Sequence, residues 1–241
     1  MPEIKNCAGE TYPVFATGKV NGCSIVQSAV PYGSVWYLKV NVAGINGGNA
    51  IVPIPGQFYM LRSVRSGLLL GRPISVYNSR KISDRNVSIE FLILLKGSGS
   101  KELVTLESGD GIELLGPLGN NWPVPAENSK VLCVGGGVGV APVAGFAITL
   151  PKKSYDFVAA FKSGSYGLDY IFPEKLTITT DDGSVGIKGM VTAAIDSESV
   201  KKYDAVYACG PTPMLAAVQK ICADAGVKCW LSMENRMACG V

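Results

Sequence analysis

The first half of the chain alternates apolar and polar residues over short segments. This alternation runs along residues 36–42 and 87–91, and the second segment passes into the apolar run 92–95. A further short apolar stretch occupies residues 112–115. Clusters of Gly, Pro, Asn and Ser separate these segments, as they do between the strands of small all-β domains. The pattern predicts a small antiparallel β-barrel.

The second half has a different pattern, in which apolar runs alternate with helical segments. The predicted buried strands are residues 131–134, 156–161, 176–180, 205–209 and 227–231. The clearest helix is Pro213–Ala225, whose apolar residues recur along one stripe. Strands that alternate with helices predict a parallel sheet covered by helices. We expect residues 1–125 to form the barrel domain, 126–231 the α/β domain and 232–241 a separate terminal segment.

Composition is that of a well-buried globular protein. Of the 241 residues, 47% are hydrophobic and 17% are charged, enough for two domains with proper cores. A net charge of +3 without a basic cluster gives no electrostatic footprint for nucleic acid. Residues 131–150 carry no charge and could span a bilayer, but five glycines and a proline favour a strand, a turn and a helix. No membrane association is expected.

Cysteine and histidine contents limit the location and the chemistry. The seven cysteines follow no disulfide spacing, and the first residues lack the apolar core of a signal peptide. Both facts predict a cytoplasmic protein. The absence of histidine removes the commonest general base, the Ser-His-Asp triad and most zinc sites. Any chemistry is therefore expected to come from a cofactor.

Two short motifs in the first half could bind a phosphorylated ligand. In Arg72-Pro73-Ile74-Ser75, the arginine offers a planar fork for phosphate and the serine a hydroxyl; an ordinary strand start would look the same. In residues 95–103, glycines and serines end a strand and open a helix, which creates an anion site or simply a capped loop with Ser100 as its N-cap.

The second half contains a glycine-rich turn in the position of a dinucleotide fingerprint. Residues 135–142 follow a buried strand and precede a helix, although Ala141-Pro142 replaces the third glycine region. Two further turns, at residues 180–189 and 209–214, also follow predicted strands. Because open parallel sheets bind ligands at the carboxyl edge, these turns favour one shared dinucleotide site.

Taken in order, RPIS, KGSGS, GPLGN, GGGVGVAP, TDDGSVGIKG, CGPTPM and ENRMACG resemble the ferredoxin–NAD(P) reductase superfamily. The ending is similar to that of electron-transfer subunits of NAD-dependent dihydroorotate dehydrogenase. The resemblance covers nearly the whole chain. It implies an FAD-binding β-barrel over residues 1–125 and an NAD-binding α/β domain over residues 126–231.

The resemblance also implies residue roles. Arg72 would hold the FAD phosphates, Pro73, Ile74 and Ser75 the flavin, and Gly99 with Ser100 the FAD pyrophosphate. Further expected contacts are Leu92, Ile93 and Leu94 beside the flavin, Gly135, Gly136, Gly137 and Gly139 at the NAD pyrophosphate, and Cys209, Gly210 and Pro211 around the nicotinamide. No catalytic side chain is assigned. The superfamily often has an aromatic residue where Ile74 stands.

The last residues resemble the start of an iron–sulfur loop. Cys239 corresponds to the first ligand of a [2Fe–2S] cluster with C-x4-C-x2-C spacing, and the sequence ends two residues later. Residues 232–241 are therefore expected to be the beginning of a cluster segment that stops after its first ligand. Cysteines encoded downstream at that spacing would favour a cluster subunit, whereas a stop codon would favour a standalone reductase.

The expected function is electron transfer from an FMN-containing dihydroorotate dehydrogenase catalytic subunit, in a heterotetramer, through the cluster and FAD to NAD+ in pyrimidine biosynthesis. A standalone or complex-bound NAD(P)H:acceptor reductase and a regulatory flavoprotein remain alternatives. NAD is favoured over NADP by the resemblance alone. Lys162 and Ser163, which follow the second α/β strand, could bind the 2′-phosphate of NADP. No acidic residue at that point could bind the ribose 2′-hydroxyl of NAD.

Overall fold

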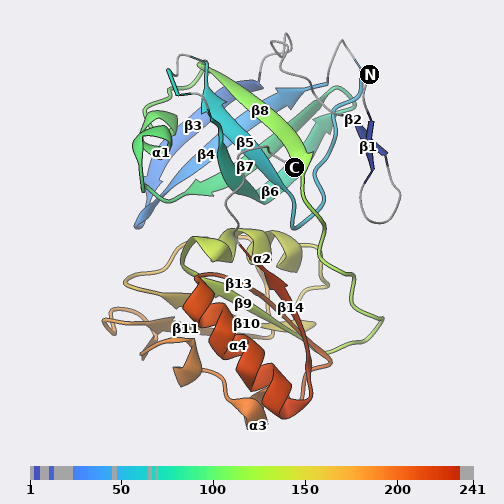
Figure 1. Ribbon diagram of the computed structural model, residues 1–241, viewed down its shortest axis with the longest axis vertical. Helices are drawn as coiled ribbons and strands as arrows, with labels where there is room; N and C mark the ends of the chain where they lie inside the picture. The colour runs from blue at the N-terminus through green and yellow to red at the C-terminus, as the bar shows by residue number, and fades with distance from the viewer. Residues whose placement is uncertain are drawn as a thin grey trace.

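The computed structural model describes residues 3–5, 11–13, 24–44, 48–64, 67–68 and 70–233. At the start of the chain, β1 (Glu3–Lys5) and β2 (Thr11–Pro13) pair as a small antiparallel sheet. The rest of the described chain forms a barrel, in the upper half of Figure 1, and a parallel sheet with helices below it.

Six antiparallel strands close the barrel in the order β3-β4-β7-β6-β5-β8. They are β3 (Ser24–Tyr32), β4 (Val35–Ala43), β5 (Phe58–Ser63), β6 (Arg72–Ser83), β7 (Asn86–Ile93) and β8 (Gly111–Leu118). The short helix α1 (Ser98–Leu103) follows β7. Inward residues such as Leu38, Leu61 and Phe91 are fully buried, because alternate side chains of each strand fill the interior. The predicted barrel is confirmed.

The second half is a six-stranded parallel sheet in the order β12-β11-β10-β9-β13-β14. Its strands are β9 (Val131–Gly136), β10 (Tyr155–Phe161), β11 (Lys175–Thr180), β12 (Ile187–Lys188), β13 (Ala205–Cys209) and β14 (Lys228–Ser232). The intervening helices are η2 (Gly137–Gly139), α2 (Val140–Ala147), η3 (Val191–Ala193), α3 (Ser197–Val200) and α4 (Thr212–Ala225). The predicted parallel sheet and the predicted helix α4 are confirmed.

Parallel pairing brings the sequence motifs to one edge of this sheet. The strands β9, β10, β11 and β13 all end there, so the turns that follow them lie along the same edge. No helix in the described parts of the chain combines the length and apolar content needed to cross a bilayer. The uncharged segment that could have spanned a membrane is instead β9, η2 and α2.

Helix α2 lies between the barrel and the parallel sheet (Figure 1). It contacts β6 through Gly145, where an added Cβ would lie 2.8 Å from the main-chain oxygen of Tyr77. Beside it, the Trp122 indole N–H donates to the Pro142 carbonyl at 3.1 Å. The Tyr207 hydroxyl donates to the Pro123 carbonyl at 2.9 Å. These contacts fix how the two halves face each other.

Replacement Gly145→Ala is expected to destabilise the protein. Alanine is intrinsically the better helix former, by about 1 kcal/mol, but here its Cβ would meet main-chain atoms that cannot rotate away. Overpacking of this kind costs about 1–3 kcal/mol, which a urea unfolding curve would show. Gly67→Ala is the control, because no described atom lies within 4 Å of that position. Unchanged or increased stability of Gly145→Ala would contradict this account of the seam.

Candidate functional site

The predicted flavin residues divide between the two faces of the barrel wall. Leu92 and Leu94 face the α2 side, where they pack with the core of the second half. Ser75 lies on the same face, because it is two residues from Tyr77, which belongs to that core. Ile93 is fully buried inside the barrel, so only its main chain could reach a ligand on the outer face.

The other two predicted flavin residues of β6 are Ile74 and Pro73. Ile74 packs inward against the barrel core, which removes its side chain from any stacking position. Pro73 pairs with Met60 of β5 at the beginning of β6. The outer wall that faces the second half is therefore built by alternate residues of β6 and β7.

Arg72 lies directly against the first turn of α1. An added Cβ at Gly99 would be 2.0 Å from Arg72 Nε, so glycine is the residue that lets the guanidinium lie there. Within the described chain, Nε is buried and has no hydrogen-bond partner. A buried, unpartnered guanidinium N–H is costly, and a phosphate oxygen would satisfy it.

Ser100 is the third residue of α1, whose N-cap is Gly97. Its hydroxyl accepts from the main-chain N–H groups of Lys96 at 3.0 Å and Gly97 at 3.1 Å, and donates to the Gly97 carbonyl at 2.9 Å. The sequence left open an anion site or a loop with Ser100 as its N-cap; the N-cap is instead Gly97, and the Ser100 hydroxyl bonds back to it from within the first turn. Ser100 shapes the turn, and Arg72 supplies the charge.

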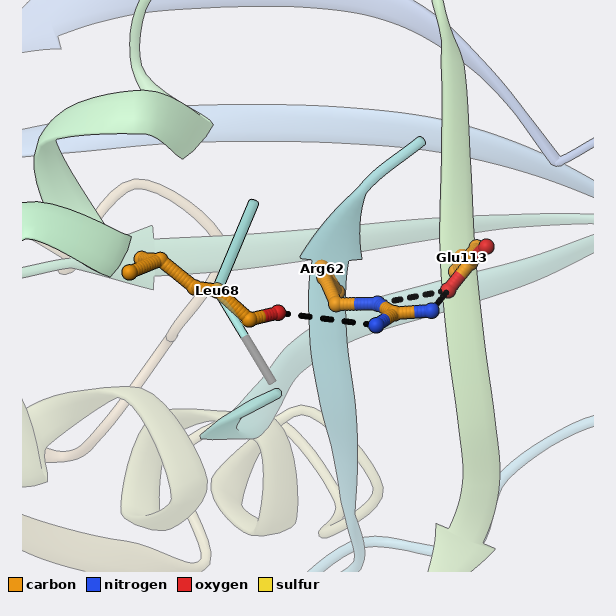
Figure 2. A network of polar contacts seen from close by, with 3 residues as sticks. All are labelled: Arg62, Leu68 and Glu113. Atoms are coloured by element: carbon orange, nitrogen blue, oxygen red, sulfur yellow. Dashed lines mark hydrogen bonds and ion pairs between the residues drawn. The ribbon is translucent and has the colours of Figure 1, made fainter. Parts of the chain in front are cut away.

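An arginine on β5 supports the segment that precedes Arg72 (Figure 2). Arg62 Nε donates to Glu113 of β8 at 2.7 Å, and Nη2 forms a second, short bond to the same carboxylate. Arg62 Nη1 donates to the Leu68 carbonyl at 3.5 Å. One planar fork therefore joins two strands to the connection that enters β6.

The glycine-rich turn after β9 serves mainly close packing. Added Cβ atoms would lie 2.8 Å from Val140 Cα at Gly135, 2.2 Å from Met214 Sδ at Gly136 and 2.6 Å from the Cys209 carbonyl at Gly139. These three glycines let β9, α2 and α4 approach one another.

Gly137 differs from the other glycines of this turn. It has a φ of +53°, and the nearest atom to its added Cβ is the Tyr166 hydroxyl, 3.9 Å away. Gly137 is therefore the member of the turn that leaves open space for a ligand. A positive φ also makes glycine the favoured residue there.

The Cys209-Gly210-Pro211 turn lies beside the same glycines. Cys209 pairs with Gly135 in the sheet, and α4 begins directly after Pro211. Gly210 leaves room for the end of the Met214 side chain, 2.6 Å from an added Cβ. The structure thus places the two predicted NAD motifs in contact.

An acidic residue that the sequence did not single out lies at the same edge. Asp182, in the turn after β11, accepts from Ser184 N–H at 2.9 Å, and the Ser184 hydroxyl accepts from Gly164 N–H at 2.9 Å. The bonds from Ser184 lower the pKa of Asp182. A carboxylate therefore lies beside the end of β10, although it belongs to the turn that follows β11.

Comparison with known proteins identifies the chain. No family model matches it. It is 41% identical over 189 residues to the electron transfer subunit of dihydroorotate dehydrogenase B (NAD(+)) from Clostridium acetobutylicum, covering 78% of this chain and 74% of the relative. The subunit from Caldanaerobacter subterraneus subsp. tengcongensis is 36% identical, with the same coverage. The chain belongs to this family of electron transfer subunits.

Solved structures agree on the fold. The structure of an NADH-dependent reduced ferredoxin–NADP oxidoreductase has a TM-score of 0.71 at 26% identity, covering 93% of this chain and 80% of the other. Phthalate dioxygenase reductase has a TM-score of 0.61 at 17% identity, covering 91% and 70%. The barrel followed by a parallel sheet is the ferredoxin reductase-type fold, and the predicted resemblance is confirmed.

The remaining predicted site residue of this electron transfer subunit is Cys239, which lies outside the described residues. In the described part of the chain, no three Cys, Asp or Glu residues gather where they could hold a metal ion. The cluster ligand therefore stays a prediction, as do the individual FAD and NAD contacts.

Two glycines of the turn after β9, Gly136 and Gly139, should differ in their tolerance of alanine. At Gly139 the new Cβ would meet the Cys209 main chain, whereas at Gly136 it would meet the end of the flexible Met214 side chain. We expect Gly139→Ala to lose about 1–3 kcal/mol of unfolding free energy and Gly136→Ala clearly less, measured by urea denaturation. The reverse order would show that this turn does not pack as described.

Proposed function

We propose that this chain is the FAD-containing subunit that passes electrons from an FMN-containing dihydroorotate dehydrogenase catalytic subunit to NAD+ in pyrimidine biosynthesis. The observation that carries the proposal is the buried, unpartnered Arg72 Nε beside Gly99, at the start of β6. The relatives' name, electron transfer subunit, supports the same role.

FAD fits the residues of the barrel. Arg72 would bind its phosphates, and the residues around Gly99 and Ser100 would shape the turn beneath them. Pro73, Ser75 and Leu94 would line the flavin, with Ile74, Ile93 and the buried Leu92 behind them. When bound, FAD supplies both hydride and single-electron transfer. The residues of this chain supply binding and orientation, which suits a sequence without histidine.

NAD fits the carboxyl edge of the parallel sheet. Gly137 offers the open main chain for the pyrophosphate, and Gly135, Gly136 and Gly139 hold the turn that presents it. Cys209, Gly210 and Pro211 would flank the nicotinamide. In this proposal residues 1–125 bind FAD, residues 126–231 bind NAD, and residues 232–241 lead toward a [2Fe–2S] cluster with Cys239 as its first ligand.

Dihydroorotate oxidation is assigned to a different subunit in this proposal. They contain no histidine, and no catalytic side chain for dihydroorotate is identified among them. A separate subunit in a cytoplasmic heterotetramer would oxidise dihydroorotate, and this chain would deliver the electrons. An NAD(P)H:ferredoxin-type reductase is the second candidate, favoured by the 26% identity to the ferredoxin–NADP oxidoreductase.

Reconstitution tests the flavin role. The purified chain should bind FAD, and NADH, but not dihydroorotate alone, should bleach the flavin absorbance. Gly99→Ala would push Nε of Arg72 aside and should weaken FAD binding at least tenfold, since hydrogen bonds to charged groups are worth about 1.5–3 kcal/mol. Gly97→Ala, two residues earlier with no atom within 4 Å, should bind FAD like the unaltered chain. Absence of FAD binding by the unaltered chain would end the proposal.

The choice between NADH and NADPH tests the role of Asp182. Its carboxylate would repel a 2′-phosphate, so we expect NADH to be preferred. Asp182→Ser should raise the kcat/KM for NADPH, because it removes the like charge that would repel the 2′-phosphate. Asp181→Ser is the control, since it removes an equal charge from the neighbouring residue and leaves the bonds between Asp182, Ser184 and Gly164 in place. Equal responses of the two variants would show that Asp182 does not face the nucleotide.

A further inference from the structure

A cluster of tyrosines and carboxylates joins the barrel to the loop that follows β10. The Tyr32 hydroxyl donates a short hydrogen bond to Asp169 Oδ2, and the Tyr77 hydroxyl donates to the same oxygen at 3.4 Å. Gly167 N–H donates to the Tyr32 hydroxyl at 3.1 Å. Residues of the first half therefore hold residues 167–169 of the second half through one carboxylate.

The donors of this cluster stay protonated at neutral pH. Burial, together with the hydrogen bond to Asp169, raises the pKa of Tyr32 to about 12. Burial also raises the pKa of Tyr77, whose side chain is 1% exposed. Both hydroxyls are thus available as donors to Asp169, and hydrogen bonds to a charged acceptor are among the stronger ones in proteins.

The loop that Asp169 holds contacts both halves of the proposed site. An added Cβ at Gly167 would lie 2.9 Å from both Leu92 Cδ1 and Val140 Cγ1. The loop therefore passes closely between the outer face of β7 and the start of α2. One residue earlier, the Tyr166 hydroxyl is the atom nearest to the open position at Gly137. A shift of this loop would therefore move Tyr166 toward or away from Gly137.

The barrel contributes one more contact to the same loop. The turn between β3 and β4 lies against it, with an added Cβ at Gly33 3.5 Å from the Tyr166 ring. Tyr32 immediately precedes this turn, and its ring contacts Tyr37 edge-on at a centroid distance of 6.4 Å. The hydroxyl that holds Asp169 is thus itself held by the packing of the barrel.

We propose that Asp169 is a positioning residue, which fixes loop 164–170 between Gly137 and the outer face of β6 and β7. By holding this loop, it sets the approach of the nicotinamide to the flavin. This inference rests on the proposed function. Asp169 acts through the neighbouring loop residues Tyr166 and Gly167. Its loss should slow transfer from NADH without removing FAD.

The chain offers a matched control at the opposite edge of the sheet. Asp156, in β10, accepts a hydrogen bond from the Tyr203 hydroxyl and an ion pair from Lys202 at 3.2 Å. Burial opposes its ionisation, but these bonds outweigh that effect and lower its pKa. Asp156→Asn therefore neutralises the same kind of carboxylate acceptor of a tyrosine hydroxyl, far along the strand from the proposed site.

The experiment follows flavin reduction by NADH in a single turnover, without oxygen, in the full chain loaded with FAD. Asp169→Asn and Tyr32→Phe should each slow reduction roughly tenfold, since small displacements of reacting groups cost factors of ten to a hundred. The double variant should be slowed less than the product of the two single effects, because both changes act on the hydrogen bond between Tyr32 and Asp169. FAD content should stay at the wild-type level, and Asp156→Asn should reduce at the wild-type rate.

Each outcome separates the two proposals. If the unaltered chain binds no FAD or is not reduced by NADH, the proposed function fails. If the unaltered chain is reduced and Asp169→Asn behaves like Asp156→Asn, the positioning role is overturned. If Asp169→Asn does not fold, Tyr32→Phe decides, because it keeps the ring and removes only the hydroxyl: a wild-type rate in that variant overturns the inference.

Discussion

The close approach of α2 to β6 is the constraint on which the rest of the structure depends. At Gly145 a helix and a strand meet main chain to main chain, with no room for a Cβ. The hydrogen bond from Trp122 and the bond from Tyr207 hold the same seam from the connector side. Because interiors are close-packed, such a contact has few alternative arrangements. It places the barrel face that carries Tyr77, Leu92 and Leu94 against the core of the second half.

The glycines of this protein show that a motif can combine two physical purposes. Gly135, Gly136 and Gly139 are small because strands and helices approach each other there, whereas Gly137 alone in that turn opens to unfilled space. The same contrast holds in the barrel, where Gly99 makes room for a guanidinium. A dinucleotide fingerprint is therefore largely a packing requirement, and only part of it concerns the ligand.

The spacing of apolar residues along the sequence predicted the barrel, the parallel sheet and α4. A half-buried strand buries every second residue and a helix buries one stripe, whichever elements they pack against. The same rule separates Ile93 from Leu92 and Leu94, since adjacent strand residues face opposite sides. Asp182 and Asp169 escaped sequence reasoning for a different reason. Asp182 follows β11 but lies beside the end of β10. Asp169 can be recognised only from its hydrogen bonds with two tyrosines of the barrel. The glycine loop at residues 180–189, already placed on the sheet edge, was the one available signal for Asp182.

The two halves are also continuous in sequence, which has a consequence for how the molecule assembles. All six barrel strands lie between Ser24 and Leu118, and all six parallel strands between Val131 and Ser232, with a single connection between them. Domains generally fold as units during synthesis, the earlier one first. The barrel can therefore close before β9 is made, without waiting for or threading through later strands. The joining of α2 to β6 then becomes a late docking step between two formed surfaces.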